Sequence, residues 1–214
     1  MRKTLPGAGT TPFSSLLSPK EKSRGPALTF SDANAVLALL TVRKAGYIGR
    51  DALAKESRLG GGAVRTLVKK LKDRGFLSTN ASGCYLTKSG AQAVDSLLKV
   101  FGPFVDAPGG GLALGESQVA MAVRGRGGSV GTGIDQRDSA IRLGASGATT
   151  YVIVGGKFTI PGGSKDCERD FPDRAWGGLR KVLKPGDGDA VVLCGASDSR
   201  TATLGALAAG LTLL

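Results

Sequence analysis

Apolar positions in the first half of the chain follow the period of the α-helix. After two residues that can cap a helix, Ser31 and Asp32, apolar side chains recur at i, i+3, i+4 and i+7, namely Ala33, Val36, Leu37 and Leu40. Gly46 ends this predicted helix, and a shorter helix is expected at about 50–57. A glycine-rich turn at 59–62 then leads into a third helix.

The third predicted helix, at about 62–73, has one apolar face and one cationic face. Its apolar residues lie within about 60° of one line along the helix: Val64, Leu67, Val68 and Leu71. The opposite arc carries Arg65, Thr66, Lys69 and Lys70. A helix that lies in the major groove of DNA needs such a cationic, hydrogen-bonding face. The alternative is a solvated basic face in a domain that contacts protein or RNA.

A hairpin and a fourth helix are expected next. The pattern predicts strands at 76–79 and 84–86 around a turn at 80–83, then a helix capped by Thr87 whose inner face is Ala91, Val94, Leu98 and Phe101. The order helix, helix, turn, helix, hairpin, helix, with the segments 62–77 and 85–90, resembles the winged helix-turn-helix regulators of prokaryotes. We therefore expect a winged helix-turn-helix domain at 30–101.

That resemblance implies roles for individual residues, because in such regulators the third helix usually enters the major groove and the wing touches the backbone or minor groove. It implies base contacts by Arg65, Thr66 and Lys69, and phosphate contacts by Lys70, Arg58 and Arg74. Asn80 and Ser82 would lie at the wing tip. The tip departs from the family in lacking the Arg or Lys often found there, so a strong wing contact is not implied.

The pattern changes after a Pro- and Gly-rich segment at 102–111, which we interpret as a linker. From 112 onward, strand-like and helical segments alternate. Strands are expected at 118–123, 148–154, 157–160 and 189–194, and helices at 134–143, 172–183 and from 197 to the C-terminus. Gly155-Gly156 predicts a two-residue hairpin. We expect an α/β domain with a mixed sheet at 112–214, and hence a two-domain chain with an α+β part and an α/β part.

Two helix starts in the second domain carry clustered polar residues that could bind a small anionic or polar ligand. One cluster follows a buried strand and contains Ser197, Asp198, Ser199 and Arg200. The other contains Asp135, Arg137 and Asp138. Free backbone N–H groups at a helix start favour an anion. The alternatives are ordinary N-capping at the first cluster and capping with a surface ion pair at the second.

Charge separates the two halves. Of the net charge of +12, residues 1–100 contribute +11 (17 Lys/Arg, 6 Asp/Glu) and the rest +1, which favours a polyanion-binding half beside a half with another task.

Residues 1–29 are basic and proline-containing, and we expect a disordered arm. The chain has no histidine and three scattered cysteines, which excludes Ser-His-Asp and Cys-His catalysis and disfavours zinc. We expect no cofactor or metal.

The combined pattern predicts a DNA-binding transcription regulator with a ligand-sensing second domain. No apolar run of about 18 residues is present, so we expect no membrane span and a cytoplasmic location. The segments 134–141, 144–150 and 193–198 resemble an uncharacterised archaeal family with an N-terminal winged helix and a C-terminal domain of unknown function; the resemblance implies no activity. The expected partners are double-stranded DNA, a small anionic metabolite and a second copy in a homodimer.

Two other function classes stay open. One is a nucleotide- or magnesium-dependent enzyme with a DNA-binding appendage, in which Asp135, Asp138 and Asp198 serve as acid, base or metal ligands. The absence of histidine and of a recognised cofactor motif makes an enzyme the less favoured class. The other is a nucleic-acid or protein scaffold that binds no ligand.

Overall fold

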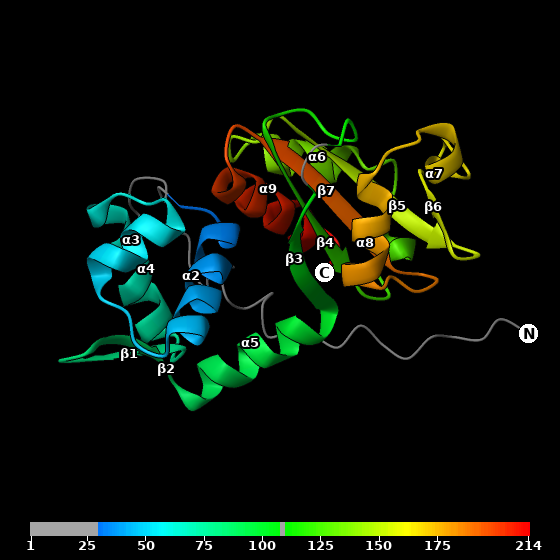
Figure 1. Cartoon of the computed structure of the whole chain (residues 1–214). Helices are drawn as coiled ribbons and strands as arrows, with labels where there is room; N and C mark the ends of the chain where they lie inside the picture. Colours follow the sequence, from blue (N-terminus) through cyan, green and yellow to red (C-terminus); the bar gives the residue numbers. More distant parts are fainter. Residues whose placement is uncertain (1–29, 108–109) are drawn as a thin grey trace, which may run out of the picture. The chain divides into compact units, whose positions relative to one another are not determined.

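The computed structural model describes residues 30–107 and 110–214, so the predicted basic arm at 1–29 lies outside the described residues. The chain divides into two compact units, residues 1–94 and 95–214, shown in Figure 1. Helix α5 (Lys88–Val100) contains the point of division. No helix of the described ranges is both long and apolar enough to cross a membrane.

The first unit consists of three helices, a hairpin and the start of α5. The helices are α2 (Asp32–Ala45), α3 (Arg50–Ser57) and α4 (Gly61–Asp73), and the antiparallel strands are β1 (Leu77–Asn80) and β2 (Gly83–Leu86). The backbone of Ile48, between α2 and α3, exchanges two hydrogen bonds with Cys84 of β2, at 2.8 and 3.0 Å. This bridge attaches the hairpin to the helical part of the unit.

The core of the first unit follows the predicted face in α4, whereas in α2 the predicted Leu37 and Leu40 are half-buried and Leu39 is fully buried. Val64, Leu67, Val68 and Leu71 of α4 are all buried, as their spacing predicts. Polar contacts position the helices as well, since the buried Asn34 side chain donates from Nδ2 to the carbonyl oxygen of Ser57 at 3.1 Å, joining α2 to the end of α3.

The prediction for the fourth helix was partly wrong. Leu98 is 48% exposed, whereas its neighbour Leu97 is 2% exposed, so the buried face of α5 is rotated by one residue. Phe101 is buried, but it belongs to the strand that follows α5 and not to the helix. The apolar pattern continued across the helix end because a buried strand began there.

The second unit contains a five-stranded sheet with the order β3-β4-β7-β5-β6. The strands are β3 (Phe101–Asp106), β4 (Ser117–Val123), β5 (Gly147–Val154), β6 (Lys157–Thr159) and β7 (Ala190–Ala196). Every neighbouring pair is antiparallel, so the predicted mixed sheet was wrong. Strands β4 and β5, which a helix separates in the chain, are not neighbours, because β7 inserts between them and runs antiparallel to both.

The predicted linker at 102–111 is also corrected by the sheet. Phe101–Asp106 form the edge strand β3, which pairs with β4 from Phe101↔Val123 to Asp106↔Val119. The register shifts between Phe101 and Phe104, where Gly102 and Pro103 lie. Proline lacks an N–H donor and is tolerated on an edge strand or at a bulge, which explains why a linker-like composition occurs in a strand.

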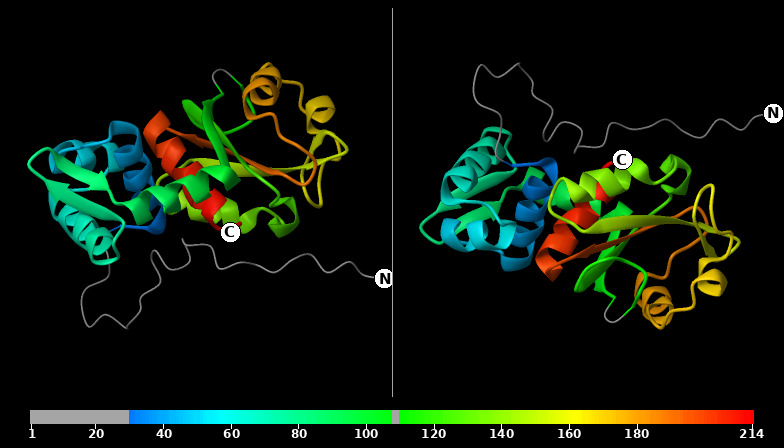
Figure 2. Two further views of the ribbon diagram at one scale, coloured as in Figure 1. Left: turned by 90° about the horizontal axis from the view of Figure 1, so that it is seen from below. Right: turned by 90° about the horizontal axis from the view of Figure 1, so that it is seen from above.

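Helices cover both faces of the sheet (Figure 2). Helices α6 (Ile134–Ile141) and α9 (Ser199–Leu211) pack on one face, and the short α7 (Cys167–Asp170) and α8 (Ala175–Leu183) on the other. The predicted helix at 172–183 therefore begins later, at Ala175. A 3-10 turn, η1 (Gly127–Ser129), follows β4.

The central strand β7 shows why its sequence is apolar throughout. Val191 and Leu193 belong to the core that contains α8, whereas Val192 and Cys194 belong to the core that contains α6 and α9. Helix α9 approaches the strand closely through Gly205, where a Cβ atom would lie 2.6 Å from the Cys194 sulfur. At the sheet edge, the predicted Gly155-Gly156 hairpin is confirmed, and both glycines have positive φ, 56° and 73°.

Candidate nucleic-acid interface

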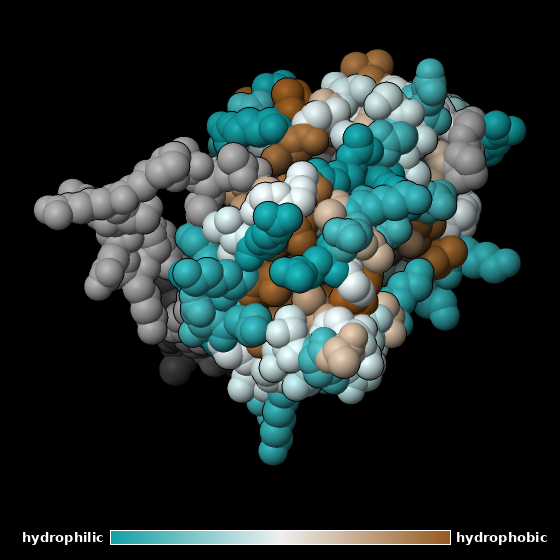
Figure 3. Space-filling view, turned by 90° about the vertical axis from the view of Figure 1, so that its left-hand side faces the viewer, coloured by the Kyte–Doolittle hydropathy of each residue, from teal (hydrophilic) through white to brown (hydrophobic). Residues whose placement is uncertain are grey.

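The exposed face of α4 is the cationic face that the sequence pattern predicts. Arg65, Thr66 and Lys69 are exposed on the side opposite the buried apolar residues. The helix begins at a glycine N-cap, Gly60, that supplies no side-chain hydrogen bond. Figure 3 looks toward the first unit and shows hydrophilic side chains spread widely over that face, with small apolar patches between them.

A groove of about 630 Å³ lies between α4, the hairpin and the start of α3. Four cationic side chains line it: Arg50, Arg65, Lys69 and Lys72. Lys72 also donates from Nζ to the Thr79 hydroxyl of β1 at 2.9 Å, across the groove from helix to hairpin. The groove thus combines positive charge with hydrogen-bond donors along one side of α4.

A second, smaller hollow of about 270 Å³ lies at the start of α4. It is lined by Arg50, Asp51, Gly61, Val64 and Arg65. Arg65 and Arg50 therefore line both depressions. Of the residues with a predicted base contact, Arg65 is the one placed between the two.

The structure separates the predicted phosphate contacts from this groove. Lys70 is half-buried and does not line either depression. Arg58 is the C-cap of α3, with left-handed backbone at φ 56°. Arg74 is half-buried. Burial raises the pKa of Asp32, and the positive charge of Arg74 acts against this increase, which places Arg74 near the start of α2. Arg58 and Arg74 thus lie at the C-terminal ends of α3 and α4, and they line neither depression.

The hairpin tip is built as the sequence predicts, without a cationic side chain. Asn80 and Ser82 are both exposed, and the Ser82 N–H donates to the Asn80 side-chain oxygen at 2.9 Å. This short contact holds the two-residue turn. Asn80 also lines the groove, so the tip contributes polar but uncharged surface to it.

Two groove residues, Arg50 and Lys72, were missed by reasoning from the sequence. Lys72 lies eight residues after Val64, at about 80° on the helical projection, just outside the arc from which the polar face was taken. Arg50 lies at the start of another helix, and no periodicity connects it with α4. Burial raises the pKa of the Cys84 thiol, and the charges of Arg50 and Lys72 act against it, which places both cations close to β2.

In the second unit, the start of α9 is capped by its own carboxylate. Asp198 accepts hydrogen bonds from the Thr201 N–H at 3.0 Å and from the Thr201 hydroxyl at 2.7 Å. Ser199 donates to Asp106 of β3 at 3.2 Å. The position that an anion would take at this helix start is therefore occupied by Asp198, as in ordinary N-capping.

The two predicted ligand clusters lie at opposite ends of a helix pair. The Gln136 side chain of α6 donates to the Thr212 hydroxyl beyond the end of α9, at 2.6 Å, whereas Gly144, after α6, lies near Thr201 at the start of α9. The length of α9, 13 residues, corresponds to about 20 Å. The structure therefore does not bring Asp135 and Asp138 together with Asp198, and one site containing both clusters is not formed.

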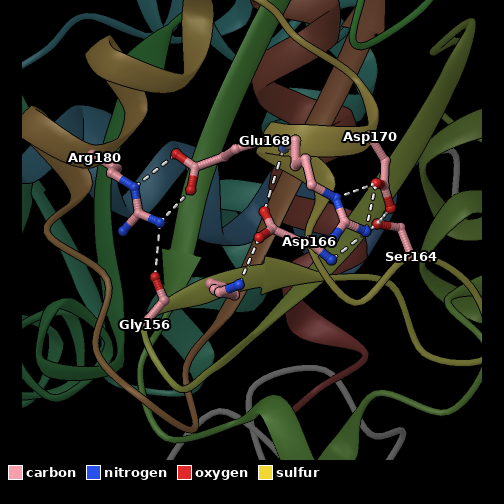
Figure 4. Close-up of polar contacts among 8 residues, drawn as sticks. Gly156, Ser164, Asp166, Glu168, Asp170 and Arg180 are labelled. Atoms are coloured by element: carbon pink, nitrogen blue, oxygen red, sulfur yellow. Dashed lines mark hydrogen bonds and ion pairs between the residues drawn. The ribbon is translucent and has the colours of Figure 1, made fainter.

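A third polar cluster connects the β5–β6 hairpin with α7 and α8 (Figure 4). Arg180 pairs with Glu168, donates to the Gly156 carbonyl oxygen at 2.7 Å and lies 5.1 Å from the centre of the Phe158 ring. The hydrogen bond from Lys157 lowers the pKa of Asp166. Because these charges are paired with one another, the cluster serves to hold the elements together.

Carboxylates are not gathered for metal binding in the described parts of the chain. Within residues 30–107 and 110–214, no group of three or more His, Cys, Asp or Glu side chains is placed to hold a metal ion. The basic groove of the first unit, which is lined by four cations, is therefore the candidate site.

Comparison with known proteins finds a family match within the second unit and one solved structure of similar fold. No curated protein matches the chain. A solved structure, the hypothetical protein PH0730 from Pyrococcus horikoshii OT3, has a similar fold, with a TM-score of 0.65 and 24% identity over 86% of this chain and 92% of that chain. Residues 114–213, from just before β4 to just beyond α9, match the family described as Domain of unknown function (DUF4443).

Proposed function

We propose that the first unit is a winged helix-turn-helix that binds double-stranded DNA, and that the protein is a transcription regulator. The observation that carries the proposal is the cationic exposed face of α4 beside the hairpin groove. Arg65, Lys69 and Lys72 project from a helix of 13 residues, and Arg50 adds a fourth cation from the start of α3. Such a helix, about 20 Å long, suits the major groove of B-form DNA.

The connections of the elements support the same proposal. Helices α3 and α4 are joined by a short turn, as in helix-turn-helix motifs, and the hairpin β1–β2 follows α4 directly. The Ile48–Cys84 bridge anchors the hairpin beside α4, so that helix and hairpin present a common surface. In this proposal α4 is the recognition helix and β1–β2 is the wing.

Charge favours a nucleic acid over a protein partner for this surface. Residues 30–94 contain eleven Lys/Arg and four Asp/Glu. Duplex DNA is favoured over duplex RNA, because the major groove of A-form RNA is too deep and narrow for side chains to read. The wing tip lacks a cation, so the proposal assigns most of the phosphate contacts to Arg50, Lys72 and Lys69.

The test is binding of the full chain to random duplex DNA and to the region upstream of its own coding sequence, measured by fluorescence anisotropy across a salt series. We expect affinity to fall steeply with salt and to be higher for one sequence. Arg65→Ala should remove that preference, at a cost of about 1–3 kcal/mol. Arg142→Ala, an exposed cation of the second unit, is the matched control and should bind as the wild type does.

A second variant separates sequence reading from charge. Lys70→Ala removes one cation from α4 outside the groove and should weaken binding less than Arg65→Ala. Failure of the wild-type chain to bind any duplex at low salt would overturn the proposal. Equal affinity for all DNA sequences, unchanged by Arg65→Ala, would exclude a role as a sequence-specific regulator. The protein would then be one that binds nucleic acid without sequence preference.

A further inference from the structure

A small hollow in the second unit lies where the first turn of α6 meets strand β5. It has a volume of about 120 Å³, and its lining includes Gly133, Ile134 and Arg137 from the start of α6, and Thr149 and Thr150 from β5. Strand β6 pairs with β5 only from Val152 onward, so this part of the β5 edge is not covered by a strand. The hollow is thus open beside a helix start and a strand edge.

The start of α6 carries backbone N–H donors beside this hollow. Its N-cap is Gly133, with φ 82°, and provides no side-chain acceptor. The helical hydrogen-bond series begins with the Arg137 N–H, which donates to the Gly133 carbonyl oxygen at 3.1 Å. The N–H groups of Ile134, Asp135 and Gln136 precede that bond, and they lie at the positive end of the helix dipole. Helices α2 and α9 are capped by side chains, whereas α3 and α4, like α6, begin at a glycine N-cap.

An independent feature of the hollow is the Thr150 hydroxyl. Thr150 is 4% exposed, and its Oγ1 atom has no hydrogen-bond partner among the described residues. Alternation along β5 directs this side chain to the α6 face, because Tyr151 and Ile153 face α8. A Cβ atom on Gly133 would lie 3.9 Å from the Thr150 Cβ, and Thr150 belongs to the lining of the hollow, so the side chain lies beside the uncapped helix start. A buried hydroxyl without a partner lowers stability unless a bound group satisfies it.

Arg137 supplies a positive charge at the rim. Its guanidinium donates to Asp138 at 3.0 and 3.1 Å, and both side chains of this pair are well exposed, at 50% and 41%. Exposed pairs of this kind contribute little to stability, so Arg137 can turn toward a bound anion at small cost. The carboxylate of Asp135, in the same turn, is exposed and does not line the hollow.

We propose that this hollow binds a phosphate group, held by the first-turn N–H groups of α6, the Thr150 hydroxyl and the Arg137 guanidinium. The volume corresponds to about four water molecules, which suits a tetrahedral oxyanion and is too small for a nucleoside. The three kinds of donor match the oxygens of a phosphate, and no carboxylate lines the hollow to repel it. This site lies within the second unit and does not depend on DNA binding.

The direct test uses the full chain labelled with ¹⁵N and titrated with inorganic phosphate at constant ionic strength. We expect the amide signals of Ile134, Asp135 and Gln136 to shift in a saturable manner. Thr150→Val removes the hydroxyl and keeps the shape of the side chain, and it should weaken phosphate binding at least about three-fold. Arg137→Gln should weaken it about ten-fold, because a charged donor is lost.

Thr203→Val is the matched control, because its hydroxyl donates to the Ser199 carbonyl oxygen of α9, away from the hollow. It should leave phosphate affinity unchanged. Thr150→Val should melt at the same or a higher temperature than the wild type without phosphate, but phosphate should raise its melting temperature less. Titration with glycerol 3-phosphate, compared with inorganic phosphate, distinguishes a phosphomonoester from the free ion as the preferred source.

Two results would overturn the proposal. One is the absence of shifts in Ile134–Gln136 when phosphate shifts only signals of α4, since the basic first unit also attracts anions. The other is equal phosphate affinity of the wild type and Thr150→Val. Either result leaves the DNA-binding proposal untouched, because that proposal is tested on α4 with Arg65→Ala.

Discussion

The two units of the chain use charged residues in different ways. Residues 95–214 contain thirteen Lys/Arg and twelve Asp/Glu, and these form internal pairs such as Arg124–Asp189 at 2.8 Å and Lys157–Asp166 at 2.7 Å. Residues 30–94 contain eleven Lys/Arg and four Asp/Glu. The four cations that line the groove of the first unit share that lining with one carboxylate, Asp73. Charge therefore stabilises the second unit from within, whereas in the first it faces outward and favours an external polyanion.

The two units also differ in how their central elements are buried. In the second unit the central strand β7 is buried from Ala190 to Ala196, with helices on both of its faces. In the first unit α4 buries one face and leaves the other to the groove. A substitution in the centre of the second unit should therefore act on stability alone, and a substitution on the exposed face of α4 on binding alone.

The largest expected effect comes from Leu193→Ala in β7. Leu193 is 0% exposed, and its truncation should lower the free energy of unfolding of the second unit by about 2–5 kcal/mol. Trp176, the one tryptophan of the sequence, is packed in the same core and reports the transition in urea by its fluorescence. Duplex binding should persist at low urea, because the groove belongs to the first unit.

The matched variant for this comparison is Leu67→Ala in α4, which is also 0% exposed. It should abolish duplex binding and leave the Trp176 transition nearly unchanged. A shift of the Trp176 transition as large as that caused by Leu193→Ala would show that the two units unfold together, and would remove the separation on which the comparison depends.

What the sequence could predict depended on the range of the interaction involved. The buried face of α4 follows from a local period and was confirmed residue by residue, and the predicted polar face is exposed except at Lys70, which is half-buried. The mixed sheet was wrong because strand order depends on β7, which pairs with strands about 40 and 70 residues before it. The grouping of Arg50 with α4, and of Thr150 with the start of α6, required the folded chain, since no local pattern connects residues of different elements.

The second expected effect concerns the buried carboxylate of Asp189. Burial acts to raise the pKa of Asp189, but the hydrogen bonds from Arg124, Gly186 and Gly125 outweigh it, and the pKa lies below its usual value of 3.8. The pair therefore contributes stability at pH values above 3.8, and this contribution is lost as the pH falls through the lowered pKa. Asp189→Asn should cost about 2 kcal/mol at neutral pH, because Arg124 loses its charged acceptor.

The measurement is urea unfolding followed by Trp176 fluorescence at neutral pH and at the lowest pH at which the chain folds. The difference between the wild type and Asp189→Asn should shrink at the acidic end. Asp187→Asn, at an exposed neighbouring position, is the control and should cost little at either pH. A difference that is constant over the whole range would show that the ionised form of Asp189 is not what stabilises the unit.

The third effect sharpens the charge comparison through the salt dependence of binding. Arg50→Gln together with Lys72→Met removes two of the four groove cations without changing the base contact proposed for Arg65. The slope of log affinity against log salt should decrease in magnitude by about 2, one for each lost phosphate contact, for all sequences alike. An unchanged slope would show that these two cations do not contact phosphates. The DNA-contacting surface would then have to be assigned to the side of α4 that carries Thr66 and Lys70.

The smallest effect is expected at the hairpin tips, where both units have a two-residue turn. Ala81 is exposed at the tip of β1–β2 and has no charge, so Ala81→Lys should place a new cation where a wing would meet the DNA backbone. One additional phosphate contact should raise duplex affinity a few-fold at low salt and add about one to the salt slope. Val154→Lys, beside the Gly155-Gly156 turn of the second unit, adds the same charge at an exposed position of the other hairpin. If charge acts only where α4 and its hairpin face the DNA, the first variant gains affinity and the second does not. An equal gain in both would mean that binding responds to net charge alone, and the distinction between the two units would no longer account for it.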